Sequence, residues 1–372
     1  MNDVFAVADL FVDLVRRKAP QDVALIVYYG SYAMGSATPQ SDLDLYYIPD
    51  PGKAGALYRS IVYQGCPFEF WGVSWDFAER IATGKHHWCV APSIIANAQV
   101  LYTRSEADSA RFAELQATIA RLQQPESRTA MIKLAQETFH NTASPLYRLA
   151  IATSKHDVAG AHWVGAQLID AVLDSLALLN QVFFVKNWAS DITQLDQLQT
   201  RPDNLRERIE TILMDNDLSV AQRTAEALVA DTRALILAQT HTIKADAPVA
   251  DVFDGFYAAI QEYVNKILTA CERQNWINAS VVSAQMQKDV AFVLAYAVDG
   301  IPFSEFNVFG EYRAALDRFG FPDLTPGVEA RDGEQLAALA REFRAVFQSF
   351  LAQHNVALQS ADTLDALKRL IG

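Results

Sequence analysis

Three acidic residues with the spacing of a metal site lie in apolar segments of the first quarter of the chain. Asp42 and Asp44 stand two residues apart in SDLDLYYI, and Glu69 follows in FEFWGV. On an extended strand, residues two apart share a face, so both aspartates project one way while Leu43 and Leu45 point into a core. Carboxylates this close repel one another, and both stay ionised only with a cation between them. Because all the ligands offered are oxygens, the pattern predicts a Mg²⁺ site at Asp42, Asp44 and Glu69.

A Gly-Ser turn precedes the aspartates. The run Ala24–Tyr29 is short, apolar and rich in β-branched and aromatic residues, which is typical of a buried strand, and Gly30-Ser31 ends it. Glycine allows another backbone or a ligand to approach closely, and adjacent amide groups at a helix start can bind phosphate. A D-x-D pair alone is common on solvated edge strands. The combination of strand, Gly-Ser turn, paired acids and a third acid on the next apolar strand favours a catalytic site.

This combination resembles the signature of the DNA polymerase β-like nucleotidyltransferase superfamily. Within it, the chain is most similar to the kanamycin-type antibiotic nucleotidyltransferases, which join a small catalytic domain to a helical domain. The resemblance is strong over the first third of the chain and weak over the next. It implies that Gly30 and Ser31 bind the phosphates of ATP or another NTP. It also implies that Asp42, Asp44 and Glu69 hold divalent ions, with two Mg²⁺ expected.

The resemblance also implies a general base on the first long helix of the helical domain, and Glu137 stands in the comparable place. The alternative is that Glu137 is a solvated helix residue. Relatives usually carry an Arg or Lys shortly after the Gly-Ser pair, whereas here the chain reads Tyr32-Ala33-Met34. A phosphate-binding cation must then come from elsewhere, and Lys133 and Arg148, about one turn before and three turns after Glu137, are the candidates.

Charge and composition restrict the partners. The chain of 372 residues has 31 Lys and Arg against 44 Asp and Glu, a net charge of −13. This balance disfavours nucleic acid and favours a small cationic acceptor. The three cysteines, Cys66, Cys89 and Cys271, are widely spaced, as expected of reduced core thiols in a cytoplasmic protein. We expect neither a signal peptide nor a membrane span, and we expect either a monomer or a homodimer.

The order of elements predicts an α+β fold. An amphipathic helix over Val4–Lys18 precedes a small mixed β-sheet, and helical patterns take over from Glu106. The expected strands are Ala24–Tyr29, Leu43–Ile48, Phe68–Val73 and Ala98–Tyr102, with helical segments near Gly55–Gln64 and at Trp75–Ala82. The apolar helix Trp163–Phe184 is expected at the centre of a bundle. We therefore expect a nucleotidyltransferase domain at 1–105, a helical domain at 106–245 and an additional C-terminal helical domain at 246–372.

The expected function is Mg²⁺-dependent transfer of a nucleoside monophosphate, AMP from ATP, to a hydroxyl of a small acceptor resembling an aminoglycoside. One alternative keeps this chemistry but uses a protein or RNA acceptor, as in nucleotidyltransferases of toxin–antitoxin systems. Another is a non-catalytic nucleotide-binding protein. The missing cation after Gly30-Ser31 favours the non-catalytic alternative, and the presence of all three acids argues against it. The segment His86-His87-Trp88-Cys89 also offers metal-ligating side chains, but we expect a loop there because no second cluster follows.

Overall fold

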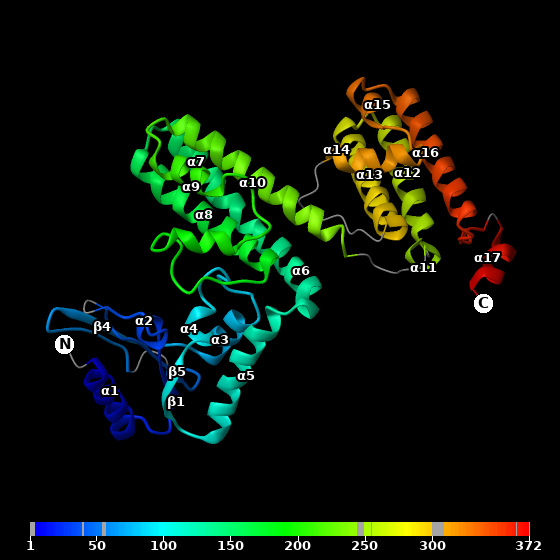
Figure 1. Cartoon of the computed structure of the whole chain (residues 1–372). Coiled ribbons are helices and arrows are strands. Elements are labelled where there is room, and N and C mark those ends of the chain that lie inside the picture. Colours follow the sequence, from blue (N-terminus) through cyan, green and yellow to red (C-terminus); the bar gives the residue numbers. More distant parts are fainter. Residues whose placement is uncertain are drawn as a thin grey trace. The chain divides into compact units, whose positions relative to one another are not determined.

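The computed structural model describes residues 4–38, 41–53, 57–243, 249–253, 255–299, 309–361 and 363–371. The chain forms two compact units, Met1–Gln239 and Thr240–Gly372 (Figure 1). The sequence predicts three domains, and its second boundary, between residues 245 and 246, lies outside the described residues. The first predicted boundary coincides with the start of the helix that begins at Glu106, capped by the Ser105 hydroxyl. The three-domain division stays a prediction.

The expected α+β fold is confirmed. A five-stranded mixed sheet in the order β3-β4-β2-β1-β5 is followed by helices only, among the described residues. Its strands β2 and β4 run parallel, and the other neighbours run antiparallel. The strands are β1 (Val23–Tyr29), β2 (Asp44–Pro49), β3 (Arg59–Tyr63), β4 (Cys66–Gly72) and β5 (Gln99–Thr103).

One prediction in this region is wrong. Residues near Gly55–Gln64 are expected to be helical, but Arg59–Tyr63 form strand β3, which pairs with β4 as a hairpin. The turn is Gln64-Gly65, with φ of 51° and 80°. Two consecutive residues with positive φ are the geometry of the type I′ turn that tight hairpins prefer. The strand has no buried face, because all five of its residues are exposed, so the alternation that marks a half-buried strand is missing.

The sheet buries one face against α1 (Val4–Lys18), whose bounds agree with the sequence prediction (Figure 1). Side chains of α1, including Phe11, pack with Leu43, Leu45 and Phe70 of the sheet in one buried cluster. The ring centroids of Phe11 and Phe70 lie 4.5 Å apart. The opposite face contacts α4 (Ser93–Ala96) and α5 (Glu106–Leu122) at β1, and α3 (Trp75–Ala82) packs on α5. Strand β4 alternates, with Phe68 and Phe70 buried on the α1 side and Glu69 exposed on the other face, whereas β1 and β2 are buried along most of their length.

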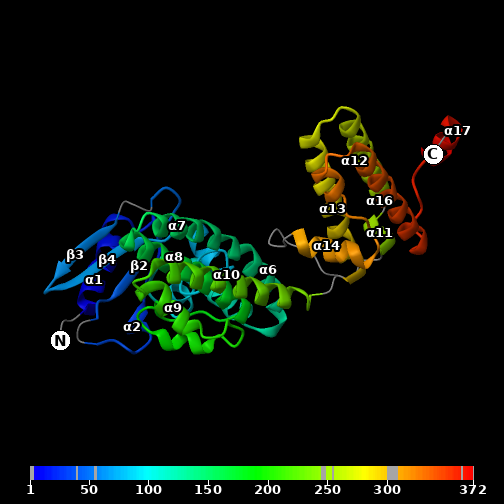
Figure 2. The same ribbon diagram turned by 90° about the horizontal axis from the view of Figure 1, so that it is seen from above.

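The rest of the first unit is a helical layer. The long helix α8 (Val158–Asn180) is its centre, as expected, with fourteen buried residues, and α6, α7 and α9 contact it. Figure 2 shows α7, α8 and α10 in this layer from above. The other described elements are α2 (Gly30–Ala33), η1 (Pro125–Ser127), α6 (Arg128–Phe139), η2 (His140–Thr142), α7 (Ala143–Ser154), η3 (Ile192–Gln197), α9 (Leu205–Met214) and α10 (Leu218–Thr240).

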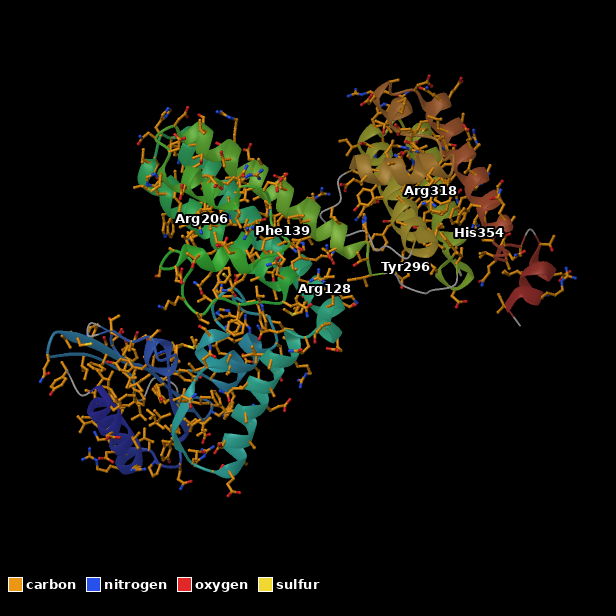
Figure 3. All side chains as sticks on the ribbon, in the orientation of Figure 1. Arg128, Phe139, Arg206, Tyr296, Arg318 and His354 are labelled. Carbon is orange, nitrogen blue, oxygen red and sulfur yellow. The ribbon has the colours of Figure 1, made fainter. Side chains whose placement is uncertain are left out.

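Arg128 ties three helices of this layer together at the start of α6 (Figure 3). Its guanidinium donates to the Leu179 carbonyl oxygen near the end of α8, and to Gln239 Oε1 on α10 at 2.7 Å. A forked donor that reaches two partners holds both helix ends in one geometry. Arg128 therefore fixes the helical layer rather than serving a ligand.

The second unit has its own apolar core. Phe253, Phe343, Phe347 and Phe350 belong to one buried cluster, in which α12 packs on both α13 and α16. Its described helices are α11 (Val249–Phe253), α12 (Phe256–Glu272), α13 (Trp276–Asp299), α14 (Phe309–Arg318), α15 (Thr325–Glu329), α16 (Gly333–Gln353) and α17 (Leu364–Ile371). None of the helices in the described part of the chain is long and apolar enough to cross a bilayer.

Candidate active site

The end of β1 and the start of β2 bring the first elements of the site together. Tyr29, the last residue of β1, pairs with Asp44, the first residue of β2. Gly30 then turns the chain into the single helical turn α2 with a φ of +69°. A Cβ at Gly30 would lie only 2.0 Å from Asp44 Oδ2. Position 30 therefore requires glycine for two reasons: its φ is positive, and the Asp44 carboxylate occupies the space that a Cβ would need.

Glu69 lies on the same face of the sheet as Asp44. In the parallel pair β2–β4, Leu45 is opposite Phe70, and both side chains belong to the buried core on the α1 side. Asp44 and Glu69 each precede one member of this pair, so both project from the opposite face. The predicted placement of Leu43 and Leu45 in the core is confirmed, since their exposed fractions are 1% and 0%.

The charges of all three acids affect the pKa of the Tyr29 hydroxyl. Burial raises the pKa of the Tyr29 hydroxyl to about 12, and the charges of Asp44, Glu69 and Asp42 add to this rise, while a hydrogen bond from Trp71 opposes it. One hydroxyl therefore lies in the field of all three carboxylates. The tyrosine is a site residue that sequence reasoning missed, although its position one residue before Gly30 could have indicated it.

Asp42 and Asp44 also interact with each other. Burial, followed by the nearby charge of Asp42, raises the pKa of the Asp44 carboxyl to about 6. A cation beside the two carboxylates would favour the ionised form of Asp44. This pair fits a hard divalent ion such as Mg²⁺, which takes oxygen ligands and completes its shell with water or phosphate oxygens.

The third acid is engaged elsewhere. Glu69 Oε1 accepts a hydrogen bond of 3.0 Å from the hydroxyl of Tyr58, the residue just before β3. Within the described residues, no group of three acid, histidine or cysteine side chains is arranged to hold a metal ion. The residues present thus supply a carboxylate pair directly. Glu69 completes a three-acid set only after its carboxylate turns from Tyr58 toward Asp44.

The other residues singled out from the sequence lie in the helical layer. Lys133 and Glu137 are both exposed on α6. Arg148 on α7 is held by α8, because its Nη2 donates to Gln167 Oε1 at 2.5 Å and its guanidinium lies 5.6 Å from the centroid of the Trp163 ring. The contacts of the described residues join none of these three side chains to the acids. Their roles stay predictions.

Ser31 is half-buried in α2, and its carbonyl oxygen accepts a hydrogen bond of 2.9 Å from Ser36 N. Two arginines lie close to the sheet. Arg104 contacts Asp50 at 2.9 Å and Asp108 at 3.0 Å. Arg59 on β3 donates to the carbonyl oxygen of Tyr58, the residue that bonds Glu69.

The loop His86–Cys89 joins the catalytic part to α8. His87 Nδ1 lies 3.0 Å from Asp174 Oδ2, and the Cys89 amide donates to Asp174 Oδ1 at 2.8 Å. Asp174 is buried, and its hydrogen bond raises the pKa of the His87 imidazole. Of the three thiols, Cys89 alone is fully buried, while Cys66 and Cys271 are half-buried, and none forms a disulfide.

A comparison with known protein families agrees with this geometry. Residues 9–65 match the family model described as the nucleotidyltransferase domain. The chain carries a nucleotidyltransferase domain. The match covers β1, the Gly30-Ser31 turn, Asp42 and Asp44, and it ends before Glu69. The predicted enzyme class, nucleotidyltransferase, is confirmed at this level.

Two further comparisons complete the picture. No curated protein matches the chain. Among solved structures, a nucleotidyltransferase-like protein from Exiguobacterium sibiricum is similar, with 12% sequence identity and a TM-score of 0.36 over 66% of this chain and 81% of that one. The nucleotidyltransferase domain therefore rests on the family model and on the arrangement of its own residues.

Proposed function

We propose that this nucleotidyltransferase moves a nucleoside monophosphate, AMP from ATP, to a hydroxyl group of a small acceptor, with Mg²⁺ as the cofactor. The observation that carries the proposal is geometric: Asp44 and Glu69 project from the same face of the sheet, and the Asp44 carboxylate lies against the Gly30 turn. Three carboxylates on one sheet face repel a triphosphate unless cations intervene. A site that binds nucleotide through such acids must therefore recruit divalent ions.

The chain's own residues have separate tasks in this reaction. Gly30 and Ser31 bind phosphate oxygens through the backbone of the turn. The acceptor oxygen forms a bond to the α-phosphorus as the bond to pyrophosphate breaks, and the acceptor proton passes to a carboxylate, for which Glu137 is the proposed base. Magnesium bound at the acids would supply the positive charge that stabilises the phosphoryl oxygens during transfer.

The acceptor is proposed from charge. A net charge of −13 favours hydroxylated amines, such as aminoglycosides, over nucleic acids. Because the kanamycin-type likeness depends on short motifs, the acceptor class needs a direct screen. Purified protein, ATP and Mg²⁺ are incubated with a panel of hydroxylated amines, and pyrophosphate release is measured. Other NTPs replace ATP in parallel reactions to find the preferred base.

The matched variant for this screen is Asp42→Asn, with Asp13→Asn as control. Both remove one negative charge, but Asp13 lies on the exposed side of α1, where its carboxylate pairs with Arg16 at 3.7 Å. We expect Asp42→Asn to lower turnover by a factor of about 10² or more, because it removes a charge from the metal site. Asp13→Asn should keep the wild-type rate. A wild-type rate in Asp42→Asn would refute the metal-dependent reaction.

A non-catalytic nucleotide-binding role is the second candidate, since Tyr32, Ala33 and Met34 replace the usual cation after Gly30-Ser31. Calorimetric binding of a non-hydrolysable NTP, with no pyrophosphate release toward any acceptor in the panel, would favour this role. Transfer of label from ATP to a protein or RNA in a cell lysate would instead favour a macromolecular acceptor.

A further inference from the structure

Strand β3 leaves one edge of the sheet unpaired. It forms a ladder only with β4 among the described residues, from Arg59–Phe70 to Tyr63–Cys66. All five of its residues are exposed, including Ile61 at 43%, Val62 at 73% and Tyr63 at 46%. An edge strand that is apolar and exposed on both faces is a template for pairing with another chain.

The hairpin register determines which backbone groups are available. In a hairpin with a two-residue turn, the residues that flank the turn, here Tyr63 and Cys66, form a hydrogen-bonded pair, and the pairs then alternate along the ladder. Tyr63, Ile61 and Arg59 therefore direct their amide and carbonyl groups toward β4. Ser60 and Val62 direct theirs outward, where no strand of the described chain meets them.

Strand β3 lacks the usual protection of sheet edges. Monomeric proteins block such edges with lysine, proline, a bulge or a covering helix. The sequence RSIVY has no lysine and no proline, and its ladder with β4 is regular. The opposite edge strand, β5, is different, because its ladder with β1 shifts register between Ile26 and Val27, as at a β-bulge. Among the described residues, the two edges of the sheet thus differ, and β3 is the one with a regular, unprotected edge.

We propose that β3 is the docking surface for a second copy of this chain, joined by antiparallel β3–β3 pairing about a two-fold axis at Ile61. This arrangement extends the two sheets into one. With Ile61 facing Ile61 of the second copy, Ser60 faces Val62 and Arg59 faces Tyr63. Each Ser60–Val62 pair exchanges N–H···O=C bonds in both directions, through the outward groups identified above.

Charge favours a second copy as the occupant. A strand paired with itself must avoid like charges opposite each other, since such pairs are destabilising. In this register the one charged residue of β3, Arg59, faces the aromatic ring of Tyr63, an arrangement that suits a cation–π contact. The side chains of Ile61 and Val62 would be partly covered by the residues opposite them in the added strand. The strand is therefore complementary to itself.

The pairing would place the second copy beside the candidate active site. Ser60 is opposite Glu69 in the β3–β4 ladder, and Tyr58, just before β3, donates to Glu69. An added strand would fix the segment that carries Tyr58 and would lie near Glu69, the third acid, in each copy. The proposal is independent of the proposed reaction, because it depends on β3 alone.

Sedimentation velocity of the full chain over about 1 to 100 µM tests the proposal, because small interfaces of this kind give micromolar affinities. The monomer mass is 41.2 kDa. We expect a species of twice this mass that grows with concentration. Val62→Lys places a charge on the exposed edge, and Ser60→Pro removes an outward amide without breaking a bond to β4. Each should weaken self-association about tenfold or more. Ser60→Pro loses roughly one hydrogen bond at each of the two symmetric pairs, and Val62→Lys must desolvate a charge at each of them.

Val100→Lys is the matched control. Val100 lies on β5, at the other edge of the same sheet, and is 42% exposed, so the substitution is identical and the edge differs. It should leave self-association unchanged, and circular dichroism should show all variants folded. A monomer at every concentration would overturn the proposal. So would a dimer that survives both β3 variants, or one that only Val100→Lys disrupts.

Discussion

Replacing Gly30 with alanine should displace the Asp44 carboxylate and lower activity while the protein stays folded. The new Cβ would lie 2.0 Å from Asp44 Oδ2, whereas real Cβ contacts are essentially never under 3.0 Å. The carboxylate must therefore move by about 1 Å or more, and a displacement of this size can lower catalysis about 10²-fold. Because a side-chain end moves more easily than backbone, the fold should survive.

The cost in stability comes mostly from the backbone. Gly30 has a φ of +69°, and an L-residue in this left-handed region costs about 1–2 kcal/mol. For a unit of this size that corresponds to a fall in melting temperature of roughly 2–8 °C. The variant should thus remain folded at 25 °C while losing nucleotidyl transfer.

Gly35→Ala provides the control. Gly35 has a nearly identical φ of +67°, but nothing lies within 4 Å of its added Cβ. The two variants share the backbone strain and differ in the contact with Asp44. Pyrophosphate release is measured with the acceptor found in the screen, and thermal unfolding is followed by circular dichroism. Equal activity in Gly30→Ala and Gly35→Ala would refute the placement of Asp44 in the site.

Four further predictions concern single side chains. Divalent-ion affinity measured by calorimetry should rise about tenfold between pH 5 and 7 in the wild type and much less in Asp44→Asn, because a carboxyl with a pKa of about 6 is mostly protonated at the lower pH. Asp174→Ala should lower the free energy of unfolding in urea by about 2 kcal/mol, since the buried Cys89 amide loses its acceptor. The His87 imidazole has a raised pKa, so its pairing with Asp174 should stabilise the fold below about pH 6.5, with the stabilisation fading as the pH rises through the raised pKa, and His87→Ala should remove this dependence. Glu137→Gln should reduce kcat about 10²-fold with unchanged nucleotide affinity, and an unchanged kcat would show that Glu137 is only a solvated helix residue.

Most of the first part of the fold is predictable because α1, β1, β2 and β4 carry buried apolar residues that mark them in the sequence. Helix α1 has the predicted bounds, and β1, β2, β4 and β5 lie within two residues of theirs. The strand β3 fails this condition, since none of its residues is buried and no period-two pattern arises.

Tertiary contacts explain the early end of α8. The apolar pattern predicts a helix to Phe184, but α8 ends at Asn180. Gln181 adopts a left-handed φ of 55°, and its side-chain amide donates to Leu122 O and Gln124 O at 2.9 and 2.6 Å. The Phe184 amide bonds to the Cys89 carbonyl instead of continuing the helix. These partners are far away in sequence, so no local pattern contains them.

The candidate site is predictable only for residues whose side-chain direction follows from strand alternation. Alternation places Asp42 and Asp44 opposite Leu43 and Leu45, and the structure has both leucines in the core. It says nothing of Tyr58, whose hydrogen bond to Glu69 depends on the position of the unforeseen strand β3. Glu137, Lys133 and Arg148 of the helical layer are predicted from the family resemblance and from their spacing along the chain. Neither the resemblance nor the spacing determines how far these side chains lie from the sheet.

The parallel register of β2 and β4 is the feature on which the three-acid arrangement depends. Leu45 and Phe70 are paired and buried on the α1 side, which forces the residues just before them, Asp44 and Glu69, onto the other face. A slip by one residue would bury a carboxylate in place of Phe70 and expose that ring. The same apolar contacts that stabilise the sheet, such as Phe11 on Phe70 at 4.5 Å, therefore hold the register that brings the acids together. Packing on one face of the sheet determines the chemistry available on the other.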